Sequence, residues 1–226
     1  MCGRYALFTP EQVPDRFNVD GAGLGVDFQA HYNITPGSVQ PVITRRRGQL
    51  RAESMKWGYQ PPWSRQEGII YRYKTFNARS EGVFDKPMWK QLIRYRRCLV
   101  PANGFYEWQD VSGGKQPYFI RPADESLFAF AGIYGFYRDE AGRERGSFAI
   151  LTTQANDSMK SLHDRMPVIL HRDMEMAWVD EIMDEPEAIK VILKPYSRNL
   201  RIVRVSQDVN TAQFDGPRLI EPIKAK

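Results

Sequence analysis

The stretch RCLVPANGFYEWQ (residues 97–109) indicates most directly how the chain folds. It contains two runs of apolar and aromatic residues, which are typical of strands. Further runs of this kind follow in PYFIRP, LFAFAGIYGFY and SFAILTT, and turns such as VSGGKQ and RDEAGRERG separate several of them. Loops of this length join neighbouring strands in antiparallel order. The middle of the chain therefore predicts mostly antiparallel β structure.

Shorter elements surround this β-rich region. Residues 41–46 and 49–57 flank Arg47-Gly48, which favours a hairpin, and 58–76 is interpreted as a long surface loop. Short helices are predicted near 9–13, 87–95, 173–183 and 185–193, and a last strand at 200–206. The 226 residues contain no internal repeat and no evident linker. A single α+β domain fits this order of elements.

The composition excludes several classes of protein. No apolar run approaches the ~20 residues that a membrane span needs, and MCGRYALFTPEQ lacks a signal-peptide pattern, so we expect a cytoplasmic protein. The net charge of +5 favours an anionic partner without requiring one. Cys2 and Cys98, with three histidines that lack ligand spacing, predict neither a metal site nor a cofactor.

Cys2 stands directly behind Met1. Once Met1 is removed, this residue would carry both a free α-amine and a thiol. Roughly one α-amine in seven is neutral at pH 7, against about one lysine in 2,500. A neutral amine attacks an aldehyde to form a Schiff base, and the adjacent thiol can close that imine into a five-membered thiazolidine. The alternative is a small residue that is merely tolerated near the terminus.

The segment FNARSE places Asn77 and Arg79 on alternate residues. In an extended chain both side chains face the same way. The amide could hold an amine by hydrogen bonding, and the guanidinium could hold a phosphate. The alternative is a helix cap followed by a surface arginine.

Glu107 lies in a strand-like run among aromatic residues. Phe105 shares its face, whereas Tyr106 and Trp108 point the other way. Desolvation raises the pKa of a carboxyl group in such surroundings and makes it a usable proton carrier. The alternative is a carboxylate at the rim of a half-exposed strand.

His163 lies in LHDRMPVIL, where Pro167 disfavours a helix at the preceding residue. We therefore predict a loop, and a loop histidine suits proton transfer near neutral pH. A purely structural histidine is the alternative. The neighbouring Asp164 and Arg165 are interpreted as a local ion pair.

The segment MKWGYQPPWSRQ interleaves Trp57, Tyr59 and Trp63 with basic side chains. This pattern suits single-stranded nucleic acid, where stacking contributes ~1–3 kcal/mol per base. The alternative is that one tryptophan belongs to the core and the rest is loop.

Taken in order, six motifs resemble the SOS response-associated peptidase (SRAP) family: MCGRY, YNITPG, KWGYQPPW, FNARSE, RCLVPANGFYEW and LHDRMPVIL. The resemblance extends from residue 2 into the tail VSQDVNTAQFDGPRLIEPI. It implies one SRAP domain over residues 2–226, with mostly antiparallel sheets that form a barrel-like core and with peripheral helices.

The resemblance also implies a function in the DNA damage response. Such a protein senses and shields abasic sites in single-stranded DNA by a covalent thiazolidine crosslink through Cys2. Asn77 would orient the amine, Glu107 would assist opening of the sugar ring, and His163 would handle protons in Schiff-base formation and reversal.

The resemblance further implies a positively charged cleft that binds DNA. Its residues would be Arg4 and Arg79 for phosphates, Trp57 and Trp63 along the DNA path, and Asn33 and Pro36 beside the site. The loop 64–75 matches the family least well. We expect a monomer that acts on DNA in the cytoplasm, at the nucleoid of a prokaryote; whether a junction with duplex DNA is preferred stays open.

Two other functions remain as alternatives. One is a peptidase whose N-terminal cysteine is the nucleophile. In its narrowest form this peptidase would only remove its own Met1. The other is a non-covalent binder of modified or damaged DNA, which needs the basic and aromatic residues but not Cys2.

Overall fold

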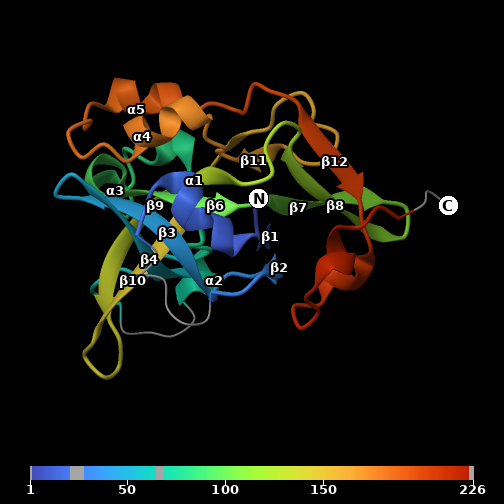
Figure 1. The fold of residues 1–226 in the computed structure, drawn as a ribbon, viewed down its shortest axis with the longest axis horizontal. Helices are drawn as coiled ribbons and strands as arrows, with labels where there is room; N and C mark the ends of the chain where they lie inside the picture. The colour runs from blue at the N-terminus through green and yellow to red at the C-terminus, as the bar shows by residue number, and fades with distance from the viewer. Residues whose placement is uncertain (1, 21–27, 65–68, 224–226) are drawn as a thin grey trace.

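A closed barrel forms the larger part of the molecule in the computed structural model, which describes residues 2–20, 28–64 and 69–223 (Figure 1). The barrel closes because β10 pairs with β4 on one side and β9 on the other. Its strands, in order around the barrel, are β4 (Gln49–Trp57), β3 (Val39–Arg46), β6 (Arg97–Ala102), β9 (Phe128–Arg138) and β10 (Glu144–Gln154). The predicted fold, with mostly antiparallel sheets around a barrel-like core, is confirmed.

A second sheet lies beside the barrel. Its strands run in the order β12 (Leu200–Arg204), β8 (Gly114–Pro122), β7 (Gly104–Val111), β1 (Tyr5–Leu7) and β2 (His31–Ile34). The stretch 97–109 thus supplies a strand to each sheet, β6 to the barrel and β7 to the second sheet. Gly104 begins β7 where a Cβ would come within 2.1 Å of the Phe119 ring, so only glycine fits.

Two short strands extend the barrel sheet at β10. β5 (Asn77–Arg79) pairs with β10 in parallel, and β11 (Arg165–Pro167) pairs with it in antiparallel order. The predicted β3–β4 hairpin is also present. Arg47 and Gly48 both have positive φ, 51° and 76°, as a two-residue turn between twisted strands requires.

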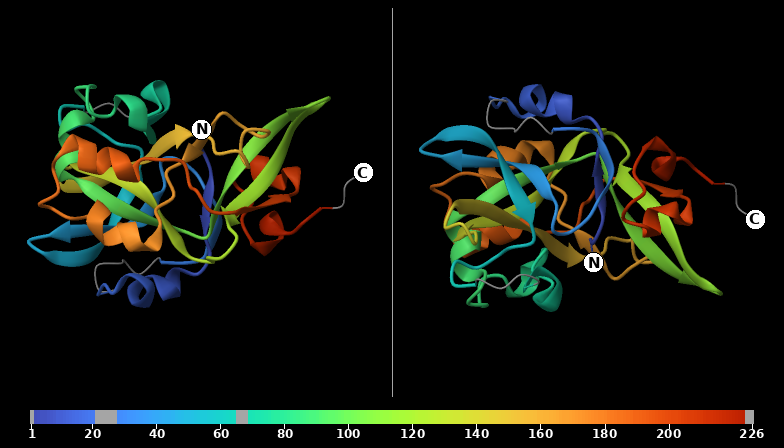
Figure 2. Two further views of the ribbon diagram at one scale, coloured as in Figure 1. Left: turned by 90° about the horizontal axis from the view of Figure 1, so that it is seen from above. Right: turned by 90° about the horizontal axis from the view of Figure 1, so that it is seen from below.

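The helices are short and lie on the outside (Figures 1 and 2). They are α1 (Val13–Phe17), α2 (Ile69–Tyr73), α3 (Lys90–Tyr95), α4 (Glu175–Trp178) and α5 (Pro186–Ile192), with 3-10 turns η1 (Pro10–Gln12), η3 (Ser80–Gly82), η4 (Arg172–Met174), η5 (Gln207–Asn210) and η6 (Pro217–Ile220). The predicted helix at 173–183 is interrupted after Trp178, because the Arg97 guanidinium binds the carbonyl oxygens of Trp178, Asp180 and Met183. The predicted surface loop 58–76 contains α2.

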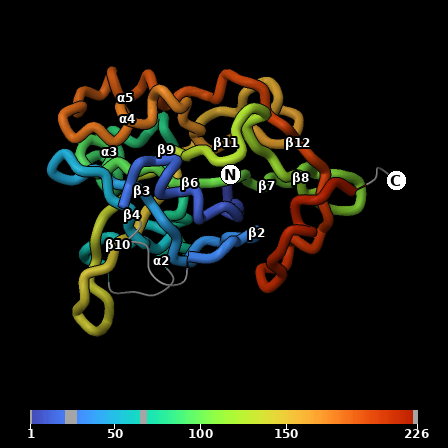
Figure 3. The backbone as a smooth tube through the Cα atoms, viewed as in Figure 1, coloured from blue at the N-terminus to red at the C-terminus, as the bar shows by residue number. Residues whose placement is uncertain are grey.

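The core fills the barrel and continues under the second sheet. Phe105 packs in the main core cluster, whereas Tyr106 packs in a smaller cluster on the other face of β7, as the alternation of these residues predicts. β1 runs where barrel and second sheet meet, so the N-terminal end lies between them (Figures 2 and 3). Among the described residues, no helix has the length and apolar character that crossing a membrane would require.

Candidate functional site

Cys2 lies just before β1 and is fully buried in the main core cluster. Its Sγ is 3.9 Å from the carbonyl oxygen of Arg4. Burial raises the pKa of the thiol to about 12, and the nearby Glu107 carboxylate adds to this shift. The thiol is therefore protonated near neutral pH, and a reaction at sulfur needs a group that takes up its proton.

Asn77 connects β5 to this cysteine. Its Nδ2 donates a hydrogen bond of 2.7 Å to the Cys2 carbonyl oxygen. Its Oδ1 is buried and has no hydrogen-bond partner among the described residues. Such an acceptor can receive a hydrogen bond from an amine. Arg79 lies two residues further along β5 and is exposed, while Ala78 between them belongs to the core.

Glu107 lines a cleft of about 560 Å³ together with Gly3 and His163. Its side chain comes from β7, and the residue is only 4% exposed. Burial raises the pKa of Glu107, and the charge of His163 offsets this only in part. Glu107 and His163 are far apart in the sequence, and the fold brings both to the cleft beside the Cys2 segment.

The predicted loop around His163 is present, and two contacts define the ring. The Arg165 N–H donates to Nδ1 at 2.9 Å, and Asp164 Oδ1 lies 2.8 Å from the same atom. The first contact requires an unprotonated Nδ1 and the second a protonated one. The surroundings therefore accommodate either tautomer of the ring at Nδ1.

The interpretation of Asp164 and Arg165 as an ion pair is wrong. The Arg165 guanidinium instead makes two hydrogen bonds to the Glu81 carboxylate, of 2.6 and 2.9 Å, and one to the Thr152 carbonyl oxygen. Arg165 is the first residue of β11, and its side chain is turned inward toward β10. Asp164 faces outward, so the nearest partner in sequence is not the nearest in space.

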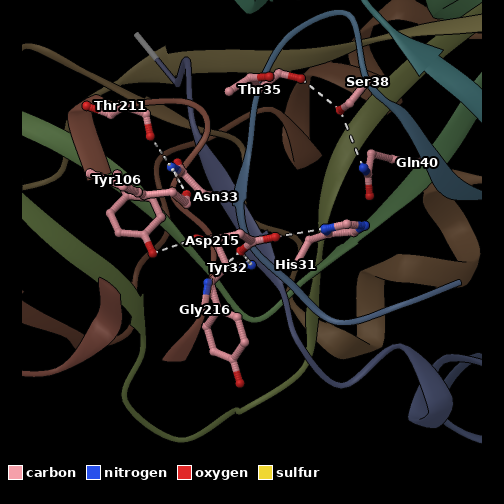
Figure 4. A network of polar contacts seen from close by, with 11 residues as sticks. His31, Tyr32, Asn33, Thr35, Ser38, Gln40, Tyr106, Thr211, Asp215 and Gly216 are labelled. Atoms are coloured by element: carbon pink, nitrogen blue, oxygen red, sulfur yellow. Dashed lines mark hydrogen bonds and ion pairs between the residues drawn. The ribbon is translucent and has the colours of Figure 1, made fainter. Parts of the chain in front are cut away.

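Arg4 and Asn33 form a second cluster, between β1, β2 and the tail of the chain. The Arg4 Nη1 donates to Asn33 Oδ1 and to the Val209 carbonyl oxygen, both at 2.6 Å. The Asn33 Nδ2 donates to the carbonyl oxygens of Thr211, at 3.1 Å, and Phe214, at 2.7 Å (Figure 4). Arg4 is thus fixed in a half-buried position by contacts that join residues more than 170 positions apart.

The tail is a part of the site that sequence reasoning missed. Asp215 accepts hydrogen bonds from His31 and from the Tyr32 backbone N–H (Figure 4). Asn210 accepts one from the Trp108 indole. Trp108 lines the cleft, and the Arg4 guanidinium lies 5.9 Å from the centre of its ring. The tail motif was recognisable in the sequence, but no local pattern indicates its partners.

The aromatic residues separate into two groups. The interpretation of Trp57 as part of a DNA path is wrong: its side chain is fully buried in the barrel, where its Nε1 donates to the Phe76 carbonyl oxygen at 2.9 Å. Trp63, by contrast, is 74% exposed. The alternative in which one tryptophan belongs to the core is therefore correct for Trp57. Of the loop 64–75, residues 65–68 lie outside the described residues.

The charges around the cleft are mixed. Lys74 and Lys115 line it together with Asp110 and Asp164. Within the described ranges, no three histidine, cysteine, aspartate or glutamate side chains gather as they would around a metal ion. The cleft lining offers the buried carboxyl group of Glu107 and the imidazole of His163, and the fully buried Cys2 precedes the lining residue Gly3.

Comparison with known proteins identifies the family. The model of the family described as SOS response associated peptidase (SRAP) matches residues 1–212. The chain belongs to the SRAP family. It is 34% identical over 224 residues to the abasic site processing protein YoqW of Bacillus subtilis, and the match covers 98% of this chain and 99% of that protein.

Other SRAP relatives agree. The abasic site processing protein HMCES of Gallus gallus is 34% identical over 229 residues, which cover 87% of this chain and 67% of that protein. A crystal structure of a protein from Bacteroides thetaiotaomicron has a TM-score of 0.89 and 26% identity, and the alignment covers 99% of this chain and 100% of that one. The SRAP fold thus extends over nearly the whole chain.

Proposed function

We propose that this SRAP protein captures abasic sites in single-stranded DNA by forming a covalent bond through Cys2 once Met1 has been removed. The observation that supports this most is the position of Cys2: it is hydrogen-bonded to Asn77 and adjoins a cleft that Glu107 and His163 share. The names of the relatives, abasic site processing proteins, support the same substrate.

The proposed reaction has two bond-forming steps. The α-amine of Cys2 attacks the C1′ aldehyde of the ring-opened deoxyribose, and loss of one water leaves an imine. The sulfur then adds to the imine carbon while the thiol proton passes to the imine nitrogen. The product is a thiazolidine, and its mass equals that of the protein plus that of the DNA minus one water.

The state of the thiol favours this order of steps. Burial raises the pKa of the Cys2 thiol and so favours its protonated form, whereas a free α-amine is neutral in a sizeable fraction of molecules near neutral pH. The amine is therefore the better first nucleophile. The sulfur follows intramolecularly, when the imine carbon is already held next to it.

Glu107 and His163 serve as proton carriers in this scheme. Because burial raises the pKa of Glu107, this carboxyl group can both donate and accept a proton closer to neutral pH than an exposed one. Opening of the sugar ring needs one proton to be removed from the hydroxyl group at C1′ and one to be donated to the ring oxygen. His163, at the same cleft, handles the proton that moves when the imine forms or reverts.

The DNA strand is held by the basic side chains around the cleft. Arg79 is exposed and can reach a phosphate, and Arg4 is held in position for one by Asn33 and Val209. Trp63 offers an exposed ring for stacking. We expect a monomer that acts at the nucleoid and that tolerates duplex DNA beside the single strand.

Intact-mass spectrometry tests the proposal. The mature protein, mixed with an oligonucleotide that contains one abasic site, should gain the mass of the DNA minus one water, and this adduct should survive heating. Neither Cys2→Ala nor Cys2→Ser should form this heat-stable adduct. Because both variants keep the α-amine once Met1 is removed, each should give only an imine, which requires borohydride trapping. Cys98→Ala is the matched control and should react as the wild type does. A heat-stable adduct on Cys2→Ala would refute Cys2 as the nucleophile.

A peptidase with Cys2 as its nucleophile is the second candidate, because the family description contains that activity. The raised pKa of the thiol counts against it, since a cysteine peptidase attacks as the thiolate. Turnover of a peptide library by mature protein that forms no DNA adduct would favour this candidate. Salt-sensitive DNA binding with no mass change would instead favour a non-covalent binder.

A further inference from the structure

The short helix α2 carries two exposed aromatic rings and ends one residue before Lys74, which lines the cleft. Tyr71 is 63% exposed and Tyr73 is 58% exposed, whereas Ile69 and Ile70 on the same helix are buried. Large aromatic side chains are seldom left in water without a binding role when several occur together. We call residues 71–74, Tyr-Arg-Tyr-Lys, the tyrosine strip.

The strip is held firmly although its rings are exposed. The Tyr71 hydroxyl donates to the Pro36 carbonyl oxygen at 2.9 Å, and a Cβ at Gly37 would lie 2.7 Å from that hydroxyl. Ile70 packs against Gly58, where a Cβ would come within 2.4 Å of it. Two glycines therefore make room for α2, and the ring of Tyr71 is fixed in place before any ligand arrives.

The strip also carries positive charge and leads into the cleft. The Arg72 guanidinium lies 5.4 Å from the centre of the Tyr73 ring. Lys74 ends the helix with a left-handed backbone, φ 51°, and lines the same cleft as Glu107 and His163. Aromatic faces next to cations, continuous with the cleft, suit a flexible anionic chain that has flat bases.

We propose that the tyrosine strip binds the single-stranded DNA that flanks the reacting nucleotide. Tyr71 and Tyr73 lie two positions apart on α2 and face different sides of the helix, so each stacks on a separate base of the strand. Arg72 and Lys74 contact its phosphates. This subsite rests on the proposed function for the identity of its ligand. It contributes affinity independent of base sequence, because every base offers a face for stacking.

Fluorescence anisotropy with an undamaged single-stranded oligonucleotide tests the strip without any covalent step. Tyr71→Ala and Tyr73→Ala should each weaken binding about fivefold to a hundredfold, the range that loss of one stacked base gives. Tyr95→Ala is the matched control, since Tyr95 is 54% exposed but lies at the end of α3, outside the strip and the cleft lining. It should bind as the wild type does. Tyr71→Phe keeps the ring and should keep most of the affinity.

Three further readouts separate stacking from charge and from misfolding. Arg72→Gln should reduce the dependence of log affinity on log salt by about 0.7, one phosphate contact on a single strand, whereas the tyrosine variants should leave it unchanged. Duplex DNA should bind the tyrosine variants and the wild type equally. Thermal unfolding should show that the variants remain folded.

The subsite and the covalent function fail in different ways. If the Tyr71→Ala/Tyr73→Ala variant binds the undamaged strand like the wild type, or loses affinity for duplex equally, the strip is not a stacking site. If it loses affinity for single strands while the wild type forms no adduct with abasic DNA, the strip stands and the covalent proposal falls.

Discussion

The two cysteines of this protein have similar surroundings by the usual measures. Cys2 and Cys98 are both fully buried, and burial raises the pKa of both thiols. Each also has a carboxylate nearby that adds to the shift, Glu107 for Cys2 and Glu53 for Cys98. Burial and thiol acidity alone would therefore not distinguish them.

The difference lies in what surrounds each carboxylate and each sulfur. Cys98 is the second residue of β6 and packs tightly against β9, where a Cβ at Gly132 would lie 2.8 Å from its Sγ. Glu53 accepts a hydrogen bond of 2.6 Å from the Thr44 hydroxyl and pairs with Arg46. Cys2 instead adjoins a cleft that contains Glu107. The adjoining cleft with its buried carboxyl group, and not the thiol itself, separates the proposed nucleophile from Cys98.

The sharpest test exchanges each carboxyl group for an amide. Glu107→Gln should slow adduct formation about a hundredfold to ten-thousandfold, the usual contribution of a positioned acid–base group. Glu53→Gln should leave the rate within about twofold, because that group has no part in the chemistry. Rates are measured by quenching time points and resolving the adduct on denaturing gels. Equal rates for the two variants would show that the carboxyl at the cleft has no special role.

A smaller loss is expected at Asn77. Asn77→Ala removes the hydrogen bond to the Cys2 carbonyl oxygen and the buried Oδ1, so the amine loses its support. We expect adduct formation about fivefold to a hundredfold slower, as loss of one buried polar partner gives. Gln116→Ala is the control, since Gln116 also donates from a buried amide but only within the second sheet. If the Gln116→Ala variant forms the adduct equally slowly, the loss of rate in both variants is due to general destabilisation.

At Cys98 the effect should fall on stability. Cys98→Ala leaves a small gap in the barrel core and should lower the free energy of unfolding by about 1–2 kcal/mol. The rate of adduct formation should not change. Urea unfolding followed by tryptophan fluorescence, together with the crosslinking assay, measures both. Slower crosslinking in a variant that is folded at the assay temperature would contradict a purely structural role.

The smallest effect is a pH dependence of stability at Glu107. Because burial raises the pKa of this carboxyl in the folded protein, the group favours folding below its ordinary pKa, and this contribution is lost as pH rises through the folded-state value. Glu107→Gln stays neutral, so it should gain stability relative to the wild type as pH rises above the ordinary carboxyl pKa of about 4.3. Thermal unfolding across this range checks the sign. If the stability advantage of Glu107→Gln over the wild type shrinks as pH rises, burial does not determine the pKa of Glu107.

Local patterns in the sequence predicted much of this fold correctly. The alternation of Phe105 and Tyr106 fixed the two faces of β7, the pair Arg47-Gly48 placed a hairpin, and Pro167 placed His163 in a loop. Each of these depends on a few neighbouring residues. Backbone preferences and side-chain alternation act over that distance, so they are visible in the sequence.

The errors concern contacts between distant residues. Trp57 faces the inside of the barrel. Its burial depends on the pairing of β10 with β4, which closes the barrel. Arg165 pairs with Glu81, 84 positions away, and not with its neighbour Asp164. No short pattern encodes such partners, because they are chosen by the folded arrangement of the sheets.

The central place of β10 has a consequence for how the protein is made. Asn77 lies on β5, which pairs with residues 150–152 of β10. The pocket around Cys2 therefore cannot assemble until those residues have left the ribosome, about 10–30 s after translation begins at common elongation rates. Throughout that interval we expect the nascent amino terminus to be open to the enzymes that trim it, so that maturation precedes folding.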